Sequence, residues 1–191
     1  MRPLKISREE MLLRCANVFK RLGYHGTTMD ALSSACGLTK ASFYHHYSSK
    51  EALLHDVLVW THTCLSQSLF AVADDTTKSP HERLAIMGRR ASKLFLNDSI
   101  GCLMGVISID AAYGAPELMG PVRNFMDDWA AAFAKLYSAS LNGSDSLRLA
   151  RQLVGNYEGA ILMARIYADP VFIDAVTLRA LTHFVSDHPA G

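Results

Sequence analysis

The chain has 191 residues, half of them hydrophobic and 19% charged, a composition typical of a folded globular protein and not of a disordered one. No window approaches about 18 uncharged apolar residues, and the N-terminal segment lacks the apolar core of a signal peptide, so we expect a soluble, cytoplasmic protein without a membrane partner. Residues 1–50 carry eight Lys and Arg against three Asp and Glu (+5), whereas the remainder carries eleven against fifteen (−4). This basic head suggests a polyanionic partner.

Three helices are predicted in the first 50 residues. Ser7 opens an S-x-x-E capping box before the first helix, and Gly23 ends that helix. One residue of the pair Thr27–Thr28 caps a short second helix that ends at Gly37, and Thr39 caps a third helix. The third helix is rich in Thr, Lys, Ser, Tyr and His. A glycine turn followed by such a polar helix is typical of a helix-turn-helix that reads a charged polymer.

Six more helices are predicted after residue 47, which makes the chain all-α with about nine helices. Ser48 with Glu51 forms a second capping box, and Ser79-Pro80 followed by Glu82 is a strong helix start. A polar connector, residues 74–78, separates the first two of these helices. The expected spans are about residues 48–73, 79–97, 101–112, 118–136, 145–168 and 170–187.

The sequence predicts neither an enzyme nor a metal or cofactor site. It contains no nucleophile elbow, no HExxH and no phosphate-binding glycine loop. The four cysteines lie far apart, with no CxxC pair and no His at ligand spacing. Most of them are expected to be small buried hydrophobic residues, with Cys102, in an apolar run, as a candidate redox or electrophile sensor.

The run TMDALSSACGLTKASFYHHYSSKEALL, residues 28–54, resembles the DNA-binding domain of TetR/AcrR-type transcriptional regulators. Their pattern reads approximately T-x-x-x-I-A-x-x-A-G-[VL]-S-x-x-x-[LF]-Y-x-[HY]-F-x-[ST]-K-E-x-L. The chain departs from it at Cys36, Thr39, Ala41 and Tyr47, where Ala, Ser, Gly and Phe are usual. The matching positions are Thr28, Leu32, Gly37, Leu38, Phe43, Tyr44, Tyr47, Lys50, Glu51 and Leu53. The resemblance is specific over about residues 7–60.

The resemblance implies a three-helix DNA-binding domain over residues 1–50 and a helical ligand-binding and dimerisation domain over residues 51–191. Residue types then suggest roles: the two capping threonines lie where free N–H groups favour a phosphate, and Lys40 with Ser42 are placed to reach base edges. Tyr44 with His45 or His46 is expected to hydrogen-bond phosphates, and Lys50 is expected to do so from the start of the fourth helix. Phe43 and Tyr47 are expected to fix the reading helix in the core. The predicted DNA contacts are Thr28, Thr39, Lys40, Ala41, Ser42, Tyr44, His45, His46 and Lys50.

The last two helices suit a homodimer interface, which would let two heads read two half-sites. Residues 147–168 are apolar on more than one face, and Gly155 and Gly159 would let another helix approach closely. Such apolar helices are poorly suited to face water. The alternative for these helices is ordinary core packing within one monomer.

The family resemblance also implies an effector pocket in the second domain, suited to a small apolar or aromatic molecule because aromatic and Met side chains stack and repack easily. Core packing is the alternative role for each of these side chains. The predicted pocket residues are Met87, Phe95, Met104, Ile107, Phe125, Trp129, Phe133, Tyr157 and Met163. Candidate polar anchors are Asp110, Tyr137, Asn156 and Arg165.

Together these features predict a ligand-responsive regulator that binds double-stranded, palindromic operator DNA as a homodimer. Release of the operator by the effector, and hence derepression, is the outcome that the family resemblance implies. The long helix from Ser48 would couple the pocket to the head. The alternative function is a helical protein-interaction module that binds no DNA, and only DNA binding predicts a steep dependence on salt.

Overall fold

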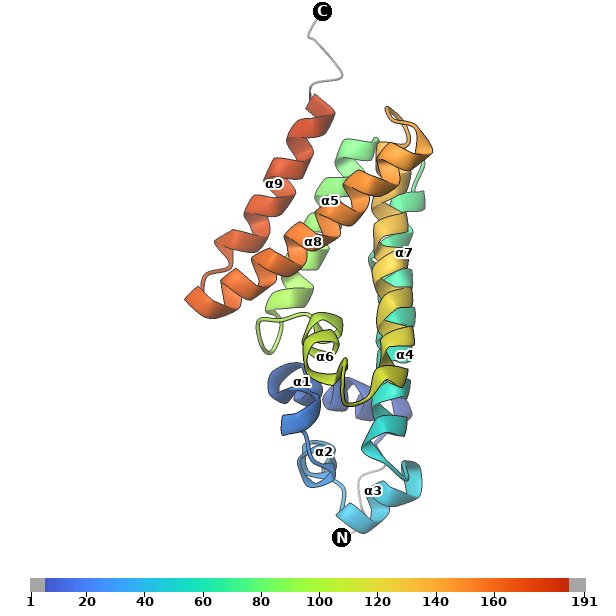
Figure 1. Ribbon diagram of the computed structural model, residues 1–191, viewed down its shortest axis with the longest axis vertical. Coiled ribbons are helices and arrows are strands. Elements are labelled where there is room, and N and C mark those ends of the chain that lie inside the picture. The colour runs from blue at the N-terminus through green and yellow to red at the C-terminus, as the bar shows by residue number, and fades with distance from the viewer. Residues whose placement is uncertain (1–5, 186–191) are drawn as a thin grey trace, which may run out of the picture. The chain divides into compact units, whose positions relative to one another are not determined.

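The computed structural model describes residues 6–185 and is all-helical over this range (Figure 1). Nine α-helices and two 3₁₀-helices make up the described chain, which confirms the predicted fold class. The elements are α1 (Arg8–Gly26), α2 (Met29–Ala35), α3 (Lys40–His46), α4 (Lys50–Ser68), η1 (Phe70–Asp74), α5 (Pro80–Leu96), α6 (Leu103–Ala111), η2 (Pro116–Leu118), α7 (Met119–Tyr137), α8 (Gly143–Tyr167) and α9 (Val171–Val185). The predicted end of the last helix, Asp187, lies outside the described residues.

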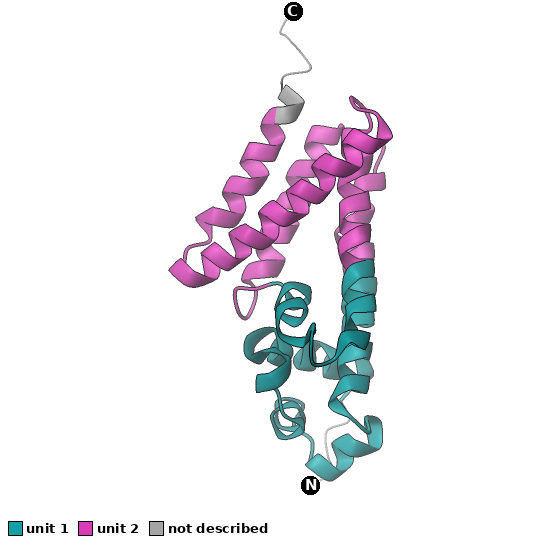
Figure 2. Ribbon diagram, in the orientation of Figure 1, with its two compact units in different colours: residues 1–64, 102–124 teal, residues 65–101, 125–191 magenta. Residues whose placement is uncertain are grey.

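The chain separates into two compact units, shown in different colours in Figure 2. Unit 1 contains residues 1–64 and 102–124, and unit 2 contains residues 65–101 and 125–191. Two of the three unit boundaries therefore fall within α4 and α7, and the third falls between α5 and α6. Within unit 1, α1 packs against both α2 and α6, whereas α9 packs against α5 and α8 in unit 2.

Two of the predicted helix starts are confirmed in atomic detail. The Ser7 hydroxyl accepts a hydrogen bond of 3.1 Å from the backbone N–H of Glu10. At α5, the Ser79 side chain accepts from the N–H of Glu82 while the Glu82 carboxylate accepts from the N–H of Ser79, a complete capping box. Each cap satisfies N–H groups that have no partner within the helix.

The predicted cap of the fourth helix was wrong by one residue. Ser49, and not Ser48, accepts a hydrogen bond of 3.1 Å from the N–H of Ala52. The carboxylate of Glu51, predicted to complete a capping box with Ser48, instead accepts a hydrogen bond from the hydroxyl of Tyr24. A tertiary partner 27 residues away therefore replaces the local one.

The fourth helix also ends earlier than periodicity predicts. It stops at Ser68, and the chain continues as the 3₁₀-helix η1 to Asp74, where a helix to about Ala73 was expected. The side chain of Arg90 donates a hydrogen bond to the carbonyl oxygen of Ser68, the last residue of the helix. Apolar spacing continues through both helix types, so sequence periodicity does not distinguish them.

Among the described helices, none combines the length and apolar character needed to cross a bilayer.

The core of unit 1 contains Leu12, Phe19, Phe43 and Leu53, which are completely buried. Unit 2 has an aromatic core centred on Trp129, and its helices are further linked by a hydrogen bond of 2.7 Å between the hydroxyls of Tyr157 and Thr177.

Candidate nucleic-acid interface

The predicted helix-turn-helix is present in unit 1. α2 ends at the turn around Gly37, whose φ of 67° lies in the left-handed region that glycine adopts without steric cost. Thr28 is the N-cap of α2 and Thr39 is the N-cap of α3, each accepting a hydrogen bond of 3.2 Å from a backbone N–H of its own helix. Both hydroxyl groups therefore hold the helix starts, and both residues remain exposed.

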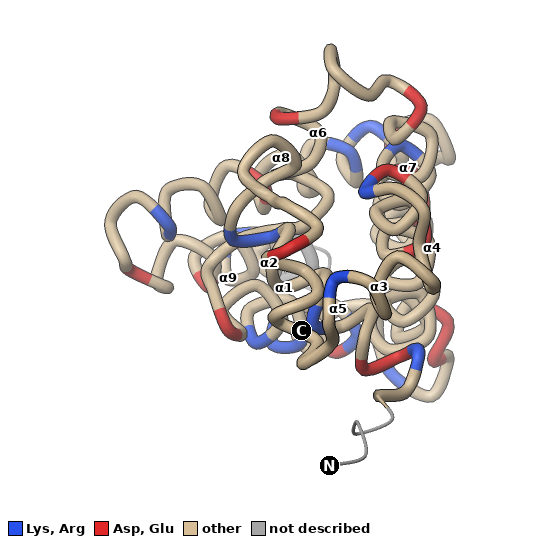
Figure 3. The backbone as a smooth tube through the Cα atoms, turned by 90° about the horizontal axis from the view of Figure 1, so that it is seen from below, with Lys and Arg blue, Asp and Glu red and all other residues tan. Residues whose placement is uncertain are grey.

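The short helix α3 presents its polar residues to solvent and one aromatic residue to the core. Phe43 is completely buried, as expected, whereas Tyr44 is 45% exposed. Figure 3 shows where the Lys and Arg residues and the Asp and Glu residues lie along the backbone. The helix α3 contains a single residue of these four types, Lys40. Its ammonium forms an exposed ion pair of 2.9 Å with Asp30 of α2, which neutralises Lys40 unless a stronger anion displaces the carboxylate. The other exposed residues of α3 are Ala41, His45 and His46, and Ser42 is half-buried.

Tyr47 closes α3 and fixes it to α4. Its hydroxyl donates a hydrogen bond of 2.8 Å to the carboxylate of Asp56, which also pairs with Arg8 at 2.8 Å. Burial and the bond to Asp56 raise the pKa of Tyr47 to about 12. The tyrosine hydroxyl, which the Phe usual at this position would lack, thus ties the end of α3 to α4 and to the start of α1.

Lys50 lies in a different setting from the one its predicted role suggests. Its ammonium donates a hydrogen bond of 2.8 Å to the carbonyl oxygen of Tyr24 and lies 4.0 Å from the centre of the Tyr24 ring. The Tyr24 hydroxyl in turn donates to Glu51 at 2.7 Å. This bond and burial raise the pKa of Tyr24 to about 12, and the same bond lowers the pKa of the Glu51 carboxyl. The start of α4 is therefore attached to the end of α1.

The same end of α1 is held by α6. Gly23 interrupts the helical path of α1 with a φ of 72° and a ψ of −176°. The carboxylate of Asp110 accepts a hydrogen bond of 2.8 Å from the backbone N–H of His25, just after this interruption. Asp110, a candidate effector anchor in the sequence, here fixes the backbone of the head. Eighty-five residues separate the two partners, so no local pattern indicated the contact.

Six of the nine predicted pocket residues form the aromatic core of unit 2 or lie in the same core. The ring of Trp129 lies 5.6–5.9 Å, centre to centre, from four neighbouring rings. Its Nε1 atom is buried, and none of the described residues accepts a hydrogen bond from it. These six residues are Met87, Phe95, Phe125, Trp129, Phe133 and Tyr157, each at most 2% exposed. Met104 and Ile107 are buried on α6 in unit 1, and Met163 is 38% exposed on α8.

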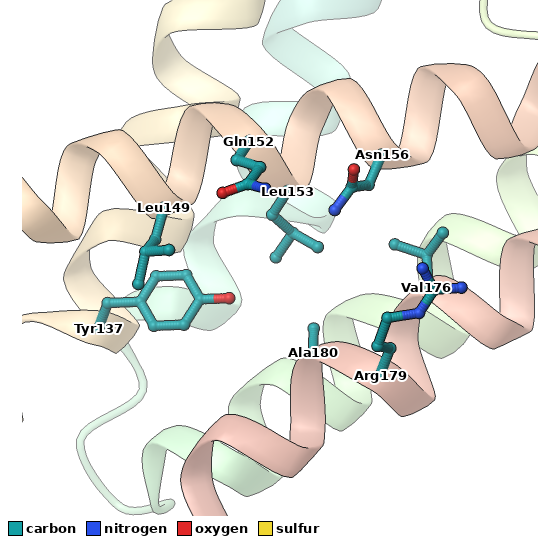
Figure 4. A pocket seen from close by; sticks show the side chains of 8 residues that line it. All are labelled: Tyr137, Leu149, Gln152, Leu153, Asn156, Val176, Arg179 and Ala180. Carbon is teal, nitrogen blue, oxygen red and sulfur yellow. The ribbon is translucent and has the colours of Figure 1, made fainter.

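A cavity of about 310 Å³ opens in unit 2 between the end of α7 and the helices α8 and α9 (Figure 4). Two of the candidate polar anchors, Tyr137 and Asn156, lie in its wall together with Arg179. Burial raises the pKa of the Tyr137 hydroxyl to about 12. The remaining lining residues are Leu149, Gln152, Leu153, Val176 and Ala180. Gln152 and Arg179 were not among the predicted residues, although each is a polar side chain on an otherwise apolar helix.

Known proteins similar to this chain include regulators with a helix-turn-helix of the kind seen in unit 1. Residues 14–57 match the family model described as bacterial regulatory proteins, tetR family. The HTH-type transcriptional repressor DhaR of Mycobacterium sp. strain GP1 is 26% identical over 165 residues, covering 83% of this chain and 82% of that protein. The relatives found are named as transcriptional regulators and not as enzymes.

Solved structures share the fold along nearly the whole chain. A TetR transcriptional regulator from Legionella pneumophila superposes with a TM-score of 0.84 at 21% identity, covering 98% of each chain. The regulator CifR, whose cysteine mutant was solved with a 26-base-pair double-stranded operator, superposes with a TM-score of 0.70 at 22% identity and covers 95% of this chain and 98% of its own.

Proposed function

We propose that this chain, a TetR-type DNA-binding transcriptional regulator, represses its target genes as a homodimer on a palindromic operator and releases the DNA when a small apolar or aromatic effector binds. The observation that carries the proposal is the helix-turn-helix of unit 1. In it, buried Phe43 fixes α3 while the opposite side of the same helix is exposed and polar. An exposed polar helix on a rigid support is what major-groove reading requires.

On the operator, α3 enters the major groove with Lys40 and Ser42 nearest the base edges. The ammonium of Lys40 exchanges Asp30 for an acceptor such as a guanine oxygen. Thr28, Thr39, Tyr44 and one of His45 and His46 contact phosphates on either side of the groove. Exposed Ala41 marks the part of α3 that approaches the DNA backbone.

Lys50 holds the head together in this proposal, since its ammonium already binds the Tyr24 carbonyl and ring. Its predicted contact with a phosphate would have to add to or replace these interactions. We therefore assign to Lys50 the positioning of α4 against α1, and we leave the phosphates to the exposed residues of α2 and α3.

The homodimer forms through α8 and α9. Exposed apolar side chains gather on these helices, an arrangement that costs free energy in water unless another surface covers it. A Cβ atom added at Gly155 or Gly159 would contact nothing within 4 Å, so this part of α8 leaves room for a partner helix. The exposed apolar residues are Leu162, Met163, Ile166, Tyr167, Val171 and Leu178.

The effector binds in unit 2. The cavity beside Tyr137 and Asn156 supplies hydrogen-bonding groups, and the aromatic core on the same helices, α7 and α8, supplies an apolar wall. The unsatisfied Nε1 of Trp129 favours a ligand that carries a hydrogen-bond acceptor as well as an aromatic or apolar body.

Effector binding reaches the head as a shift between two populations of the dimer. The covalent route is α4, which begins beside Tyr24 in unit 1 and ends in unit 2. Movement of α4 would shift α1, to which Lys50 and Tyr24 attach it, and hence the reading helix.

DNA binding is tested by mobility shift on promoter fragments at increasing salt. A TetR-type head should lose affinity steeply, with a slope of about −0.9 per phosphate contact in a plot of log K against log salt concentration. Binding that is insensitive to salt, or absent on every fragment, would favour the helical protein-interaction module.

Effector binding is tested separately by the fluorescence of Trp129 in a Trp60→Phe background, because the two tryptophans of the chain are Trp60 and Trp129. Arg179→Ala should weaken the response, whereas Arg165→Ala should not, because the candidate anchor Arg165 is exposed on α8 and does not line this cavity.

A further inference from the structure

Two of the four cysteines face one another inside the DNA-binding head. The Sγ atoms of Cys15 and Cys36 lie 3.7 Å apart, and the two residues are 0% and 4% exposed. Cys15 is in the middle of α1, whereas Cys36 is the C-cap of α2, directly before the turn of the helix-turn-helix. Both are free thiols in this structure. Twenty-one positions separate them in the sequence, so their approach is a product of the fold.

The surroundings of the pair favour one thiol over the other as the nucleophile. The guanidinium of Arg14 donates a hydrogen bond of 3.3 Å to the carbonyl oxygen of Ala35, which brings a positive charge next to Cys36. The hydrogen bond from Cys15 and the charge of Arg14 lower the pKa of the Cys36 thiol, although burial and Glu10 oppose them. The pKa of Cys15 is raised, by its bond to Cys36 and by burial. A thiolate is the nucleophilic form of cysteine, so the lowered pKa and the slight exposure of Cys36 favour it as the first to react, against a hydrogen bond of 3.8 Å from its thiol to the carbonyl oxygen of Met11.

We propose that Cys15 and Cys36 form a reversible disulfide upon exposure to a peroxide, and that this bond weakens operator binding. The Cys36 thiolate attacks the peroxide, which yields a sulfenic acid and, with hydrogen peroxide, one water molecule. The Cys15 thiol then attacks the Cys36 sulfur, forms the S–S bond and expels the sulfenic oxygen as a second water molecule. The two sulfurs lose two electrons in total and the peroxide gains them, so the reaction balances.

The disulfide must affect the reading helix because Cys36 belongs to the turn that places it. To bond, the sulfurs must close from 3.7 Å to about 2.05 Å, which requires rotation of the two side chains and, in this proposal, a shift of the end of α2 toward α1. The backbone N–H of Cys36 is bound to carbonyl oxygens of α2, and the N–H groups of Gly37 and Leu38 are bound to Ser34 and Ser33. Thr39, the N-cap of α3, follows at once, so the displacement is passed to the start of α3.

The linkage itself is tested by mass spectrometry, without DNA. The full-length protein is treated with hydrogen peroxide, alkylated and digested with trypsin. We expect peptides 15–20 and 22–40 to appear as one disulfide-linked species, two hydrogen atoms lighter than the sum of the two, and dithiothreitol should separate them. If peroxide oxidises half-buried Cys64 while peptides 15–20 and 22–40 stay unlinked, the proposal is wrong and the pair is simple core packing.

The consequence for DNA rests on the proposed function and is measured on the same samples by mobility shift. Oxidised protein should bind the operator about tenfold more weakly, the loss expected for one base contact, and dithiothreitol should restore binding. Cys36→Ala, which introduces the residue that the family pattern has there, and Cys15→Ala should bind equally with and without peroxide. The control Cys102→Ala should stay peroxide-sensitive. A linked peptide with unchanged operator affinity would overturn the regulatory half of the proposal, whereas failure of the reduced protein to bind any operator would contradict the proposed function instead.

Discussion

The carboxylate of Asp110 accepts a hydrogen bond of 2.8 Å from the backbone N–H of His25, and the same oxygen lies 2.7 Å from the point where a Cβ on Gly23 would stand. The two residues are therefore structurally coupled. Gly23 has no side chain, which leaves room for the Asp110 carboxylate, and this carboxylate binds the backbone just after the interruption at Gly23. This junction attaches α6 to the DNA-binding head within unit 1.

Gly23→Ala should destabilise unit 1 by about 1–3 kcal/mol, because the φ of 72° and ψ of −176° suit glycine alone and the new methyl group would collide with Asp110. Urea unfolding monitored by circular dichroism measures the change. Gly143→Ala is the matched control, since its Cβ would contact nothing within 4 Å at the start of α8. Equal midpoints for the two variants would contradict this account of the junction.

Lys50→Ala should lower the free energy of unfolding by about 1 kcal/mol, through loss of the hydrogen bond to the Tyr24 carbonyl and of the contact with its ring. We expect the salt dependence of operator binding by the folded variant to stay unchanged. If instead the slope falls by about 0.9 with no loss of stability, Lys50 is a phosphate contact, as predicted from its residue type and its place at the start of the fourth helix.

Lys40→Ala should change which DNA sequences are preferred, and not merely weaken binding to all of them. A contact with a base is expected to discriminate the right base from a wrong one by about 1–3 kcal/mol. In the free protein the charge of Lys40 is paired with Asp30, so its loss should cost little stability. Selection from a randomised operator library measures the preference. Lys93→Ala, a charge change on α5 of unit 2, is the control. Equal losses on specific and random DNA would rule out the base-reading role of Lys40.

Stability of the head should decrease in acid because the Glu51 carboxyl has a lowered pKa in the folded state. A carboxyl of this kind contributes its stabilisation above its unfolded value of 4.5 and loses it as the pH falls through the lower folded pKa. Urea midpoints between pH 7 and pH 3 should therefore fall less for Glu51→Gln than for the natural chain. Tyr24→Phe, which removes the donor but keeps the carboxylate, should reduce the same acid-dependent loss. An unchanged acid profile in both variants would disprove the coupling.

Ile166→Glu should convert a dimer into a monomer, because Ile166 is 62% exposed on α8 among other apolar residues and a charge there opposes burial against a second copy. Sedimentation velocity measures the mass, and operator affinity should fall with it. Ile109→Glu is the control, since Ile109 is 80% exposed on α6 in unit 1. If the natural chain already sediments as a monomer, the dimer proposal fails.

The fold was predictable because its signals are local. Capping residues such as Ser7 and Ser79, glycines at turns, and apolar spacing of three and four each act within one or two turns of helix. Predictions failed where a distant partner intervened: Tyr24 takes the carboxylate that was expected to cap α4, and Arg90 binds the last carbonyl of α4.

In the candidate DNA-binding site, too, the local features were predictable and the contacts between distant residues were not. The N-caps Thr28 and Thr39 and the buried Phe43 followed from the motif, because the helix-turn-helix is a short continuous segment. The attachment of Lys50 to Tyr24 and the meeting of Cys15 with Cys36 involve separations of 26 and 21 residues. Only the packing of α1 against its neighbours brings such pairs together.

The close packing of rings around Trp129 would limit the rate of the proposed response to an effector. Trp129 and Tyr157 are completely buried, and their ring centres lie 5.6 Å apart, so a ligand that reaches this cluster must wait until the rings separate. The observed rate of effector uptake should then level off at high effector concentration, at the rate of this opening. A stopped-flow experiment on Trp129 emission would show such a plateau, and the time needed for derepression would be set by the protein and not by the supply of effector.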